Sequence, residues 1–95
     1  MAMNIAAVFY TYDPARPEDL THARPAHREF LRGLLNNGEL LASGPFVDGG
    51  ALLIVRAEDA DAALALLEND PLNIEGIIIE RKALLWDPVL GPWAS

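Results

Sequence analysis

The sequence contains no cysteine in its 95 residues, which excludes a disulfide framework and a cysteine-based metal site. No run approaches the roughly 20 consecutive apolar residues that a membrane-spanning helix needs. Basic residues are scarce, with seven lysines and arginines against fourteen acidic residues and a net charge of −7. Because nucleic acids and anionic membranes are bound by clustered lysine and arginine, we expect neither as a partner.

The short motifs of nucleotide and serine-hydrolase chemistry are also missing. There is no P-loop, dinucleotide fingerprint or G-x-S-x-G elbow. The two histidines, His22 and His27, do not have the i, i+4 spacing of a helical zinc pair, so we expect no metal and no cofactor. Met1 to Asn4 lacks a basic segment before a long apolar run. We therefore expect no signal peptide and, with cysteine absent, a cytoplasmic protein.

Four segments have the composition of β-strands, because they are apolar, β-branched or aromatic and lie between turn signals. They are residues 3–12, 39–46, 51–56 and 76–86. Asp48-Gly49-Gly50 predicts a hairpin turn. Ser43-Gly44-Pro45 is expected to interrupt the second strand with a bulge or bend, and a ligand often approaches the backbone at such a place.

Two helices are predicted between these strands. Pro25 fits only a first helical turn, so the first helix is expected to begin near Thr21 to Arg24, after a loop from Ala15, and to end at Asn36-Asn37-Gly38. The second is expected to run from an Asp59 N-cap to the turn at Asn69-Asp70-Pro71.

This order of elements predicts one α+β domain over residues 1–95, with the ferredoxin-like β-α-β-β-α-β fold and an antiparallel sheet. The third and fourth strands contain consecutive apolar residues, a pattern of strands buried on both faces. Two helices cover only one face of such a sheet. We therefore expect the other face to pack against a second copy in a homodimer.

His27 and Asp70 are the first candidates for chemistry. His27 shares the apolar face of its helix with Phe30 and Leu31, and an imidazole moves protons near neutral pH. A structural histidine of the core is the alternative. Asp70 either orients this imidazole, as the carboxylate of a catalytic triad does, or serves only the turn before Pro71.

Several other residues are candidates for substrate binding. Arg24 lies one helical turn before His27, where it would hold an anionic group or simply face solvent. We expect a ligand near Ser43, Gly44 and Pro45, because ligands often approach the backbone at a strand bulge or bend. The aromatic residues that would line a pocket, or instead pack in the core or an interface, are Tyr10, Tyr12, Trp86 and Trp93.

Three segments together resemble the YciI-like (YCII-related) proteins. They are R-P-A-H at 24–27, L-L-N-N-G-E-L-L-A-S-G-P at 34–45 and A-L-L-E-N-D-P at 65–71. The resemblance spans nearly the whole chain in the right order. It implies a ferredoxin-like fold, a dimeric α+β barrel, and an active site in which His27 pairs with Asp70 and Ser43 belongs to the S-G-P motif.

The resemblance also bears on activity. Some YciI-like proteins resemble enzymes of aromatic-compound breakdown, which implies an enzyme that performs isomerisation or elimination on a small substrate with His27 as acid or base. Leu72 departs from the aromatic residue usual after D-P in the family, and Pro25 is unusual within R-x-x-H. A non-catalytic small-molecule-binding or dimerisation module is the alternative function.

Overall fold

The computed structural model describes residues 3–94 and has the predicted ferredoxin-like topology. Met1 and Ala2, on which the expectation of no signal peptide partly rests, lie outside the described residues. The elements are β1 (Asn4–Tyr12), α1 (Pro17–Asn36), β2 (Leu40–Pro45), β3 (Ala51–Ala57), α2 (Ala60–Leu66), α3 (Pro71–Ile74) and β4 (Ile78–Trp86). The strands form one antiparallel sheet in the order β2-β3-β1-β4.

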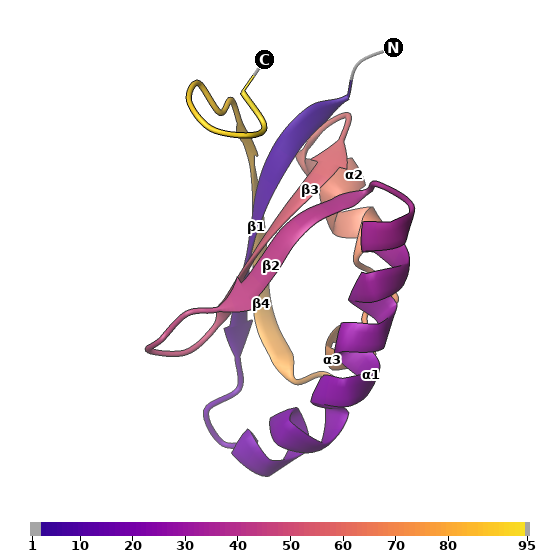
Figure 1. Cartoon of the computed structure of the whole chain (residues 1–95). Coiled ribbons are helices and arrows are strands. Elements are labelled where there is room, and N and C mark those ends of the chain that lie inside the picture. Colours follow the sequence, from indigo (N-terminus) through magenta and orange to yellow (C-terminus); the bar gives the residue numbers. More distant parts are fainter. Residues whose placement is uncertain (1–2, 95) are drawn as a thin grey trace.

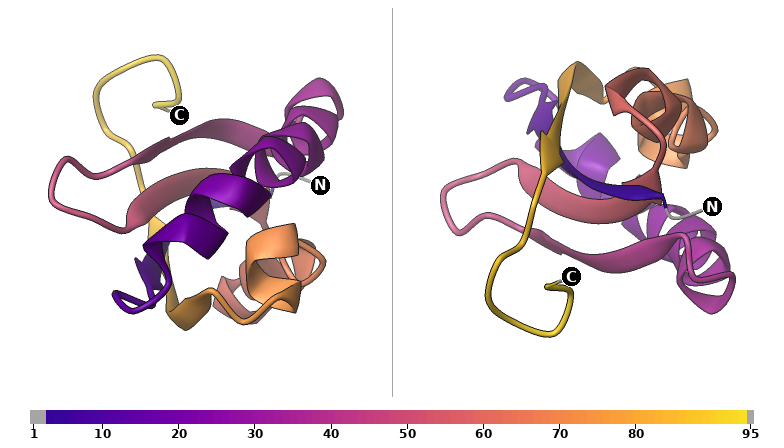
Figure 2. Two further views of the ribbon diagram at one scale, coloured as in Figure 1. Left: turned by 90° about the horizontal axis from the view of Figure 1, so that it is seen from below. Right: turned by 90° about the horizontal axis from the view of Figure 1, so that it is seen from above.

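All the helices lie on one face of this sheet, as Figures 1 and 2 show from three sides. Side chains alternate between the two faces of a strand, so every second residue of β1 and β3 points towards the helices. The buried residues on this face include Ala6, Val8, Tyr10, Leu53 and Val55. Ala23, His27 and Leu31 of α1 are also buried, which confirms the predicted inward face of this helix.

The start of α1 corrects the prediction made from Pro25. The helix begins at Pro17, where the missing N–H costs nothing, and the acidic Glu18 and Asp19 in its first turn favour the positive end of the helix dipole. Residues 17–21 are therefore helical and not a loop. Pro25 stands inside the helix on its exposed side. Figure 1 shows the first turns of α1 set at an angle to the rest, the bend expected of an internal proline.

The second predicted helix is divided in two. Asp59 caps α2 as expected, with its side chain accepting a hydrogen bond from the Ala62 N–H at 2.7 Å. The helix ends at Leu66, and a separate short helix, α3, follows from Pro71. Asp70 is the N-cap of α3 and accepts the Leu72 N–H. The expected helix end at Asn69-Asp70-Pro71 is therefore wrong: α2 ends before this turn, and the D-P pair begins α3, because proline is favoured at the first helical position.

The second strand is not interrupted at Ser43-Gly44-Pro45. β2 pairs with β3 through these residues, and the irregularity lies earlier, between Leu40 and Ala42. β2 is an edge strand, where the missing N–H of Pro45 is tolerated. The predicted hairpin turn is present. Gly50 has a φ of 78°, and a Cβ there would lie 2.6 Å from the Tyr10 carbonyl oxygen, so only glycine fits.

The other face of the sheet, here called the open face, carries the apolar side chains of Phe9, Leu52, Ile54, Leu84 and Trp86 together with the charged side chains of Arg56 and Lys82. No described helix covers it (Figure 2). Leu84 and Trp86 keep 48% and 43% of their surface exposed. The consecutive apolar residues of β3 therefore face the helices on one side of the sheet and the partly exposed apolar side chains of the open face on the other. Within residues 3–94, no helix is both long and apolar enough to span a membrane.

Candidate active site

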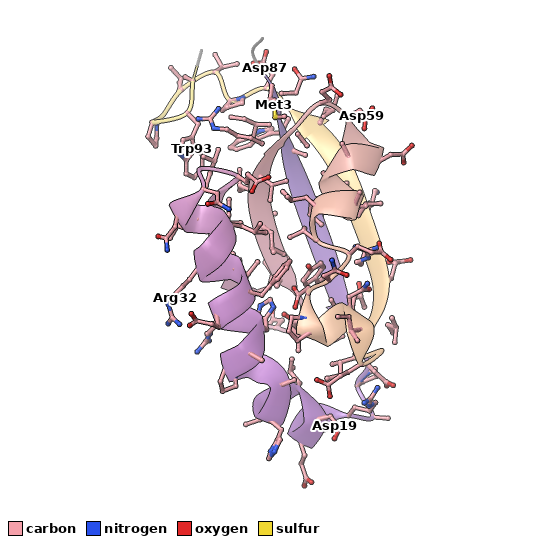
Figure 3. The ribbon with its side chains drawn as sticks, turned by 90° about the vertical axis from the view of Figure 1, so that its right-hand side faces the viewer. Met3, Asp19, Arg32, Asp59, Asp87 and Trp93 are labelled. Atoms are coloured by element: carbon pink, nitrogen blue, oxygen red, sulfur yellow. The ribbon has the colours of Figure 1, made fainter. Side chains whose placement is uncertain are left out.

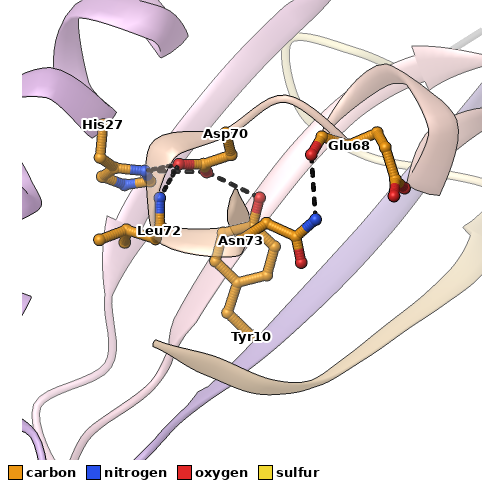
Figure 4. A network of polar contacts seen from close by, with 6 residues as sticks. All are labelled: Tyr10, His27, Glu68, Asp70, Leu72 and Asn73. Carbon is orange, nitrogen blue, oxygen red and sulfur yellow. Dashed lines mark hydrogen bonds and ion pairs between the residues drawn. The ribbon is translucent and has the colours of Figure 1, made fainter. Parts of the chain in front are cut away.

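Asp70 is fully buried between the helices and the sheet, with 0% of its surface exposed. The turn between α2 and α3 places it there, and its carboxylate accepts hydrogen bonds from three donors. The Tyr10 hydroxyl donates at 2.9 Å and the Leu72 N–H at 3.0 Å; the third donor is His27 (Figure 4). A buried carboxylate is costly unless paired and hydrogen-bonded, and these donors satisfy it.

His27 approaches Asp70 from α1, across 43 positions of sequence. Its Nδ1 atom lies 2.9 Å from both Asp70 oxygens, so the predicted approach of these side chains is confirmed. An ionised carboxylate only accepts hydrogen bonds, which places a proton on Nδ1. In the neutral ring, Nε2 is then the unprotonated nitrogen, able to take a proton from another molecule.

Tyr10 supports the carboxylate from the side opposite His27 (Figure 4). It is only 2% exposed, and burial, followed by the charge and hydrogen bond of Asp70, raises its pKa strongly. The phenol therefore stays protonated and keeps donating to Asp70. The structure shows this contact with Asp70, and direct substrate binding by Tyr10 stays a prediction.

A small cavity of about 120 Å³ opens beside His27, between α1 and the edge of the sheet. It collects most of the predicted substrate-binding residues, which were far apart in the sequence. Those that line it are Arg24, Ser43, Gly44 and Pro45, together with Tyr12. Arg28 also lines it and was missed, although its position four residues after Arg24 places it on the same side of α1.

A larger groove of about 560 Å³ lies elsewhere, between the N-terminal end of β1, the end of β4 and the C-terminal segment. Trp86 and Trp93 line it, with ring centres 6.3 Å apart in an edge-on arrangement. Figure 3 shows Met3 and Trp93 at one end of the molecule, and the groove and the His27 cavity share no described lining residue. The lining of the groove contains no histidine and no buried carboxylate, so the smaller cavity is the better candidate for acid–base chemistry.

No group of three or more histidine, aspartate or glutamate side chains in residues 3–94 is arranged to hold a metal ion. The site consists instead of an imidazole, a buried carboxylate, a phenol behind them and two guanidinium groups at the cavity. This set of groups can bind a polar small molecule and transfer a proton to or from it.

Residues 3–87 match the family of the YCII-related domain. The solved structure of 5-chloro-2-hydroxyhydroquinone dehydrochlorinase (TftG) from Burkholderia phenoliruptrix AC1100, in complex with 2,5-dihydroxybenzoquinone, is similar with a TM-score of 0.77. The alignment covers 96% of this chain and 99% of that one at 20% identity, which supports a shared fold. No curated protein matches the chain.

Proposed function

The chain belongs to the YCII-related family, and we propose that it is a cofactor-free enzyme that uses His27 to move a proton on a small ring-shaped substrate. One observation carries this proposal. The fully buried Asp70 carboxylate engages His27 Nδ1, while His27 lines a cavity. That combination fixes the tautomer of the imidazole and leaves Nε2 for the substrate, as in catalytic triads.

In the proposed reaction, Nε2 removes a proton from a ring hydroxyl or from a carbon next to a carbonyl. For an elimination, the released electron pair moves into the ring, the leaving group departs with its bonding pair, and the imidazolium then releases its proton to solvent. For an isomerisation, the imidazolium returns the proton to another carbon. Asp70 stabilises the imidazolium in both cases, while Arg24 and Ser43 hold polar groups of the substrate.

The proposed substrate class is a hydroxylated or quinonoid ring of the kind met in aromatic-compound breakdown. The structural neighbour is named as a dehydrochlorinase of a chlorinated hydroxyhydroquinone, and its structure holds a dihydroxybenzoquinone. The cavity volume is below the roughly 300–1,000 Å³ of drug-sized ligand sites. A single substituted ring is therefore the upper limit of what it holds without a change of shape.

A second copy of the chain is proposed to cover the open face, giving the dimeric barrel that the resemblance implies. The exposed apolar side chains of Leu84 and Trp86 support this partner. A cytoplasmic location stays a prediction.

The alternative function is a small-molecule-binding or dimerisation module in which the pair is structural. One observation favours it: Asp70 also caps α3 and holds the Tyr10 hydroxyl, so the carboxylate has a structural task without any chemistry. The two functions differ in what His27 does. Only in the enzyme does loss of the imidazole remove turnover while the folded protein persists.

The experiment is a screen of chlorinated hydroquinones and related ring compounds for chloride release or solvent deuterium exchange. His27→Gln is compared with His22→Gln, because His22 lies on the same helix but is exposed and outside the cavity. We expect turnover by the wild type and His22→Gln, and at least a 100-fold loss in His27→Gln. Equal activity in both variants would contradict the proposal, and no turnover with any compound would favour the binding module.

A further inference from the structure

Two arginines at the His27 cavity have no carboxylate partner within residues 3–94. Arg24 and Arg28 are four residues apart on α1, so they share a side of the helix, and both line the cavity. Of the other arginines, Arg56 also has no ion pair among the described residues but lines the larger groove away from His27, whereas three are engaged by carboxylates at 2.8–3.2 Å. Those engaged are Arg16, Arg32 and Arg81.

This pair is notable in a chain with a net charge of −7. None of the residues that line the cavity is acidic, and the nearby Asp70 carboxylate is buried behind His27 and already accepts three donors. The two guanidinium groups together outweigh that single buried charge. With His27 neutral, the cavity therefore carries an excess of positive charge in a protein that is otherwise acidic.

Tyr12 adds a third hydrogen-bond donor beside the two arginines at the cavity. It lies at the end of β1, half-buried, and lines the cavity beside Arg24 and Arg28. Burial raises the pKa of its hydroxyl, and the two arginines oppose that rise without cancelling it. The phenol is therefore protonated at neutral pH, and no protein group within residues 3–94 accepts its proton in a hydrogen bond. Such a hydroxyl is free to donate to a ligand.

We infer that Tyr12, Arg24 and Arg28 form an anion-binding wall, so that the site takes ring compounds with a carboxylate or phenolate oxygen and discriminates against their neutral analogues. Guanidinium groups recognise such oxygens through charge-assisted hydrogen bonds. The inference rests on the proposed function for the reacting nitrogen, His27 Nε2. Beyond that function, it specifies that the substrate is an anion and names the residues that bind its negative charge.

The anion-binding wall would also stabilise the negative charge that forms during the proposed proton transfer. When a base removes a proton from a ring, negative charge develops on a conjugated oxygen, and donors already aimed at that oxygen stabilise the transition state. The same wall therefore binds the anion and favours the reaction, with His27 as the one imidazole among the described residues that line the cavity.

Benzoate and its neutral isostere benzamide are suitable probes, because they differ in charge and hardly in shape. Binding is followed by NMR chemical shifts or calorimetry at low salt, without any turnover. We expect benzoate to bind the wild type about tenfold more tightly than benzamide. Arg28→Gln and Arg24→Gln should each weaken benzoate binding by about the same factor and leave benzamide unchanged.

Arg32→Gln is the matched control. It removes the same charge from the same helix, but Arg32 is paired with Glu29 and projects away from the sheet (Figure 3). Its benzoate affinity should stay within twofold of the wild type. If Arg32→Gln and Arg28→Gln lost equal benzoate affinity, the loss would come from the change in overall charge and not from the cavity, and the inference would be overturned. Equal binding of the two probes, or no binding of benzoate, would also overturn it.

His27→Gln separates this inference from the proposed function. If the wall is right, the variant still prefers benzoate over benzamide, whether or not the protein is an enzyme. If the wall is wrong and His27 is nevertheless catalytic, the arginine variants keep their affinity while His27→Gln loses turnover. Melting curves confirm that each glutamine variant is folded, as expected for arginines that are at least partly exposed.

Discussion

Replacing Asp70 by asparagine tests the physical basis of the site before any substrate is known. Asparagine keeps the shape of the side chain and is as good an N-cap as aspartate, so the start of α3 is retained. What disappears is the negative charge to which Tyr10 and His27 donate. The amide nitrogen would face one of these donors, and the remaining oxygen satisfies only part of the set.

The expected cost follows from these contacts. A hydrogen bond to a charged group contributes roughly 1.5–3 kcal/mol and a neutral one roughly 0.5–1.5 kcal/mol. The contacts with Tyr10 and His27 thus each weaken by about 1 kcal/mol, and relief of burying a charge offsets part of that. We expect Asp70→Asn to lower the free energy of unfolding by roughly 1–2 kcal/mol. For a domain of this size, Tm then falls by about 5–15 °C.

Asp59→Asn is the control, because Asp59 also caps a helix but is exposed and holds no buried donor (Figure 3). Urea and thermal unfolding of the two variants should give a change of only a few tenths of a kcal/mol for Asp59→Asn. An Asp70→Asn protein as stable as the wild type, or more stable, would show that the ionised carboxylate does not stabilise the fold. The buried charge would then be a cost to the fold and not the acceptor on which the network depends.

Other predictions concern residues around the site. Tyr10→Phe should cost about 1 kcal/mol at neutral pH. Folding raises the pKa of Tyr10. The stability that its hydroxyl contributes is therefore complete below pH about 10 and is lost above it, because the tyrosine of the unfolded chain then ionises. If urea melts gave the same difference in unfolding free energy between wild type and Tyr10→Phe at pH about 7 and about 10.5, this prediction would be wrong. Gly50→Ala should destabilise by roughly 1–3 kcal/mol more than Gly49→Ala, because both have positive φ but only Gly50 meets the Tyr10 carbonyl; equal melting temperatures would disprove it. Leu84→Asp should dissociate the proposed dimer in light scattering, while Ile74→Asp on α3 should not; a monomeric wild type would end that proposal.

The fold was predictable because its signals are local. The strands, the Asp48-Gly49-Gly50 hairpin turn and the Asp59 cap each follow from a few neighbouring residues, and their order leaves few topologies. The errors arose where two local rules compete. Pro17 and Pro25 both suit a first helical turn. The sequence does not reveal that the helix begins at Pro17, runs for 20 residues and accommodates Pro25 at a bend on its exposed side.

The site was only partly predictable, because its residues meet through tertiary structure. The apolar face of α1 placed His27 inside, but the approach of Asp70 came from resemblance, since the turn before Pro71 does not reveal which helix it faces. The hydrogen bond from Tyr10 to Asp70 spans 60 positions and has no local signal. Arg28 was within reach of sequence reasoning, because its i, i+4 relation to Arg24 places both on one side of α1.

If Asp70 holds the proton of His27 on Nδ1, Nε2 is left unprotonated at the cavity, and the tautomer of the neutral ring reveals whether this is so. A long-range ¹H–¹⁵N NMR spectrum of the wild type, assigned by comparison with His27→Gln, distinguishes the two ring nitrogens. The structure predicts that the proton is on Nδ1, donated to Asp70, and that Nε2 is unprotonated. A neutral His27 with its proton on Nε2 would contradict the account, because that nitrogen then has no lone pair with which to take a proton from a substrate.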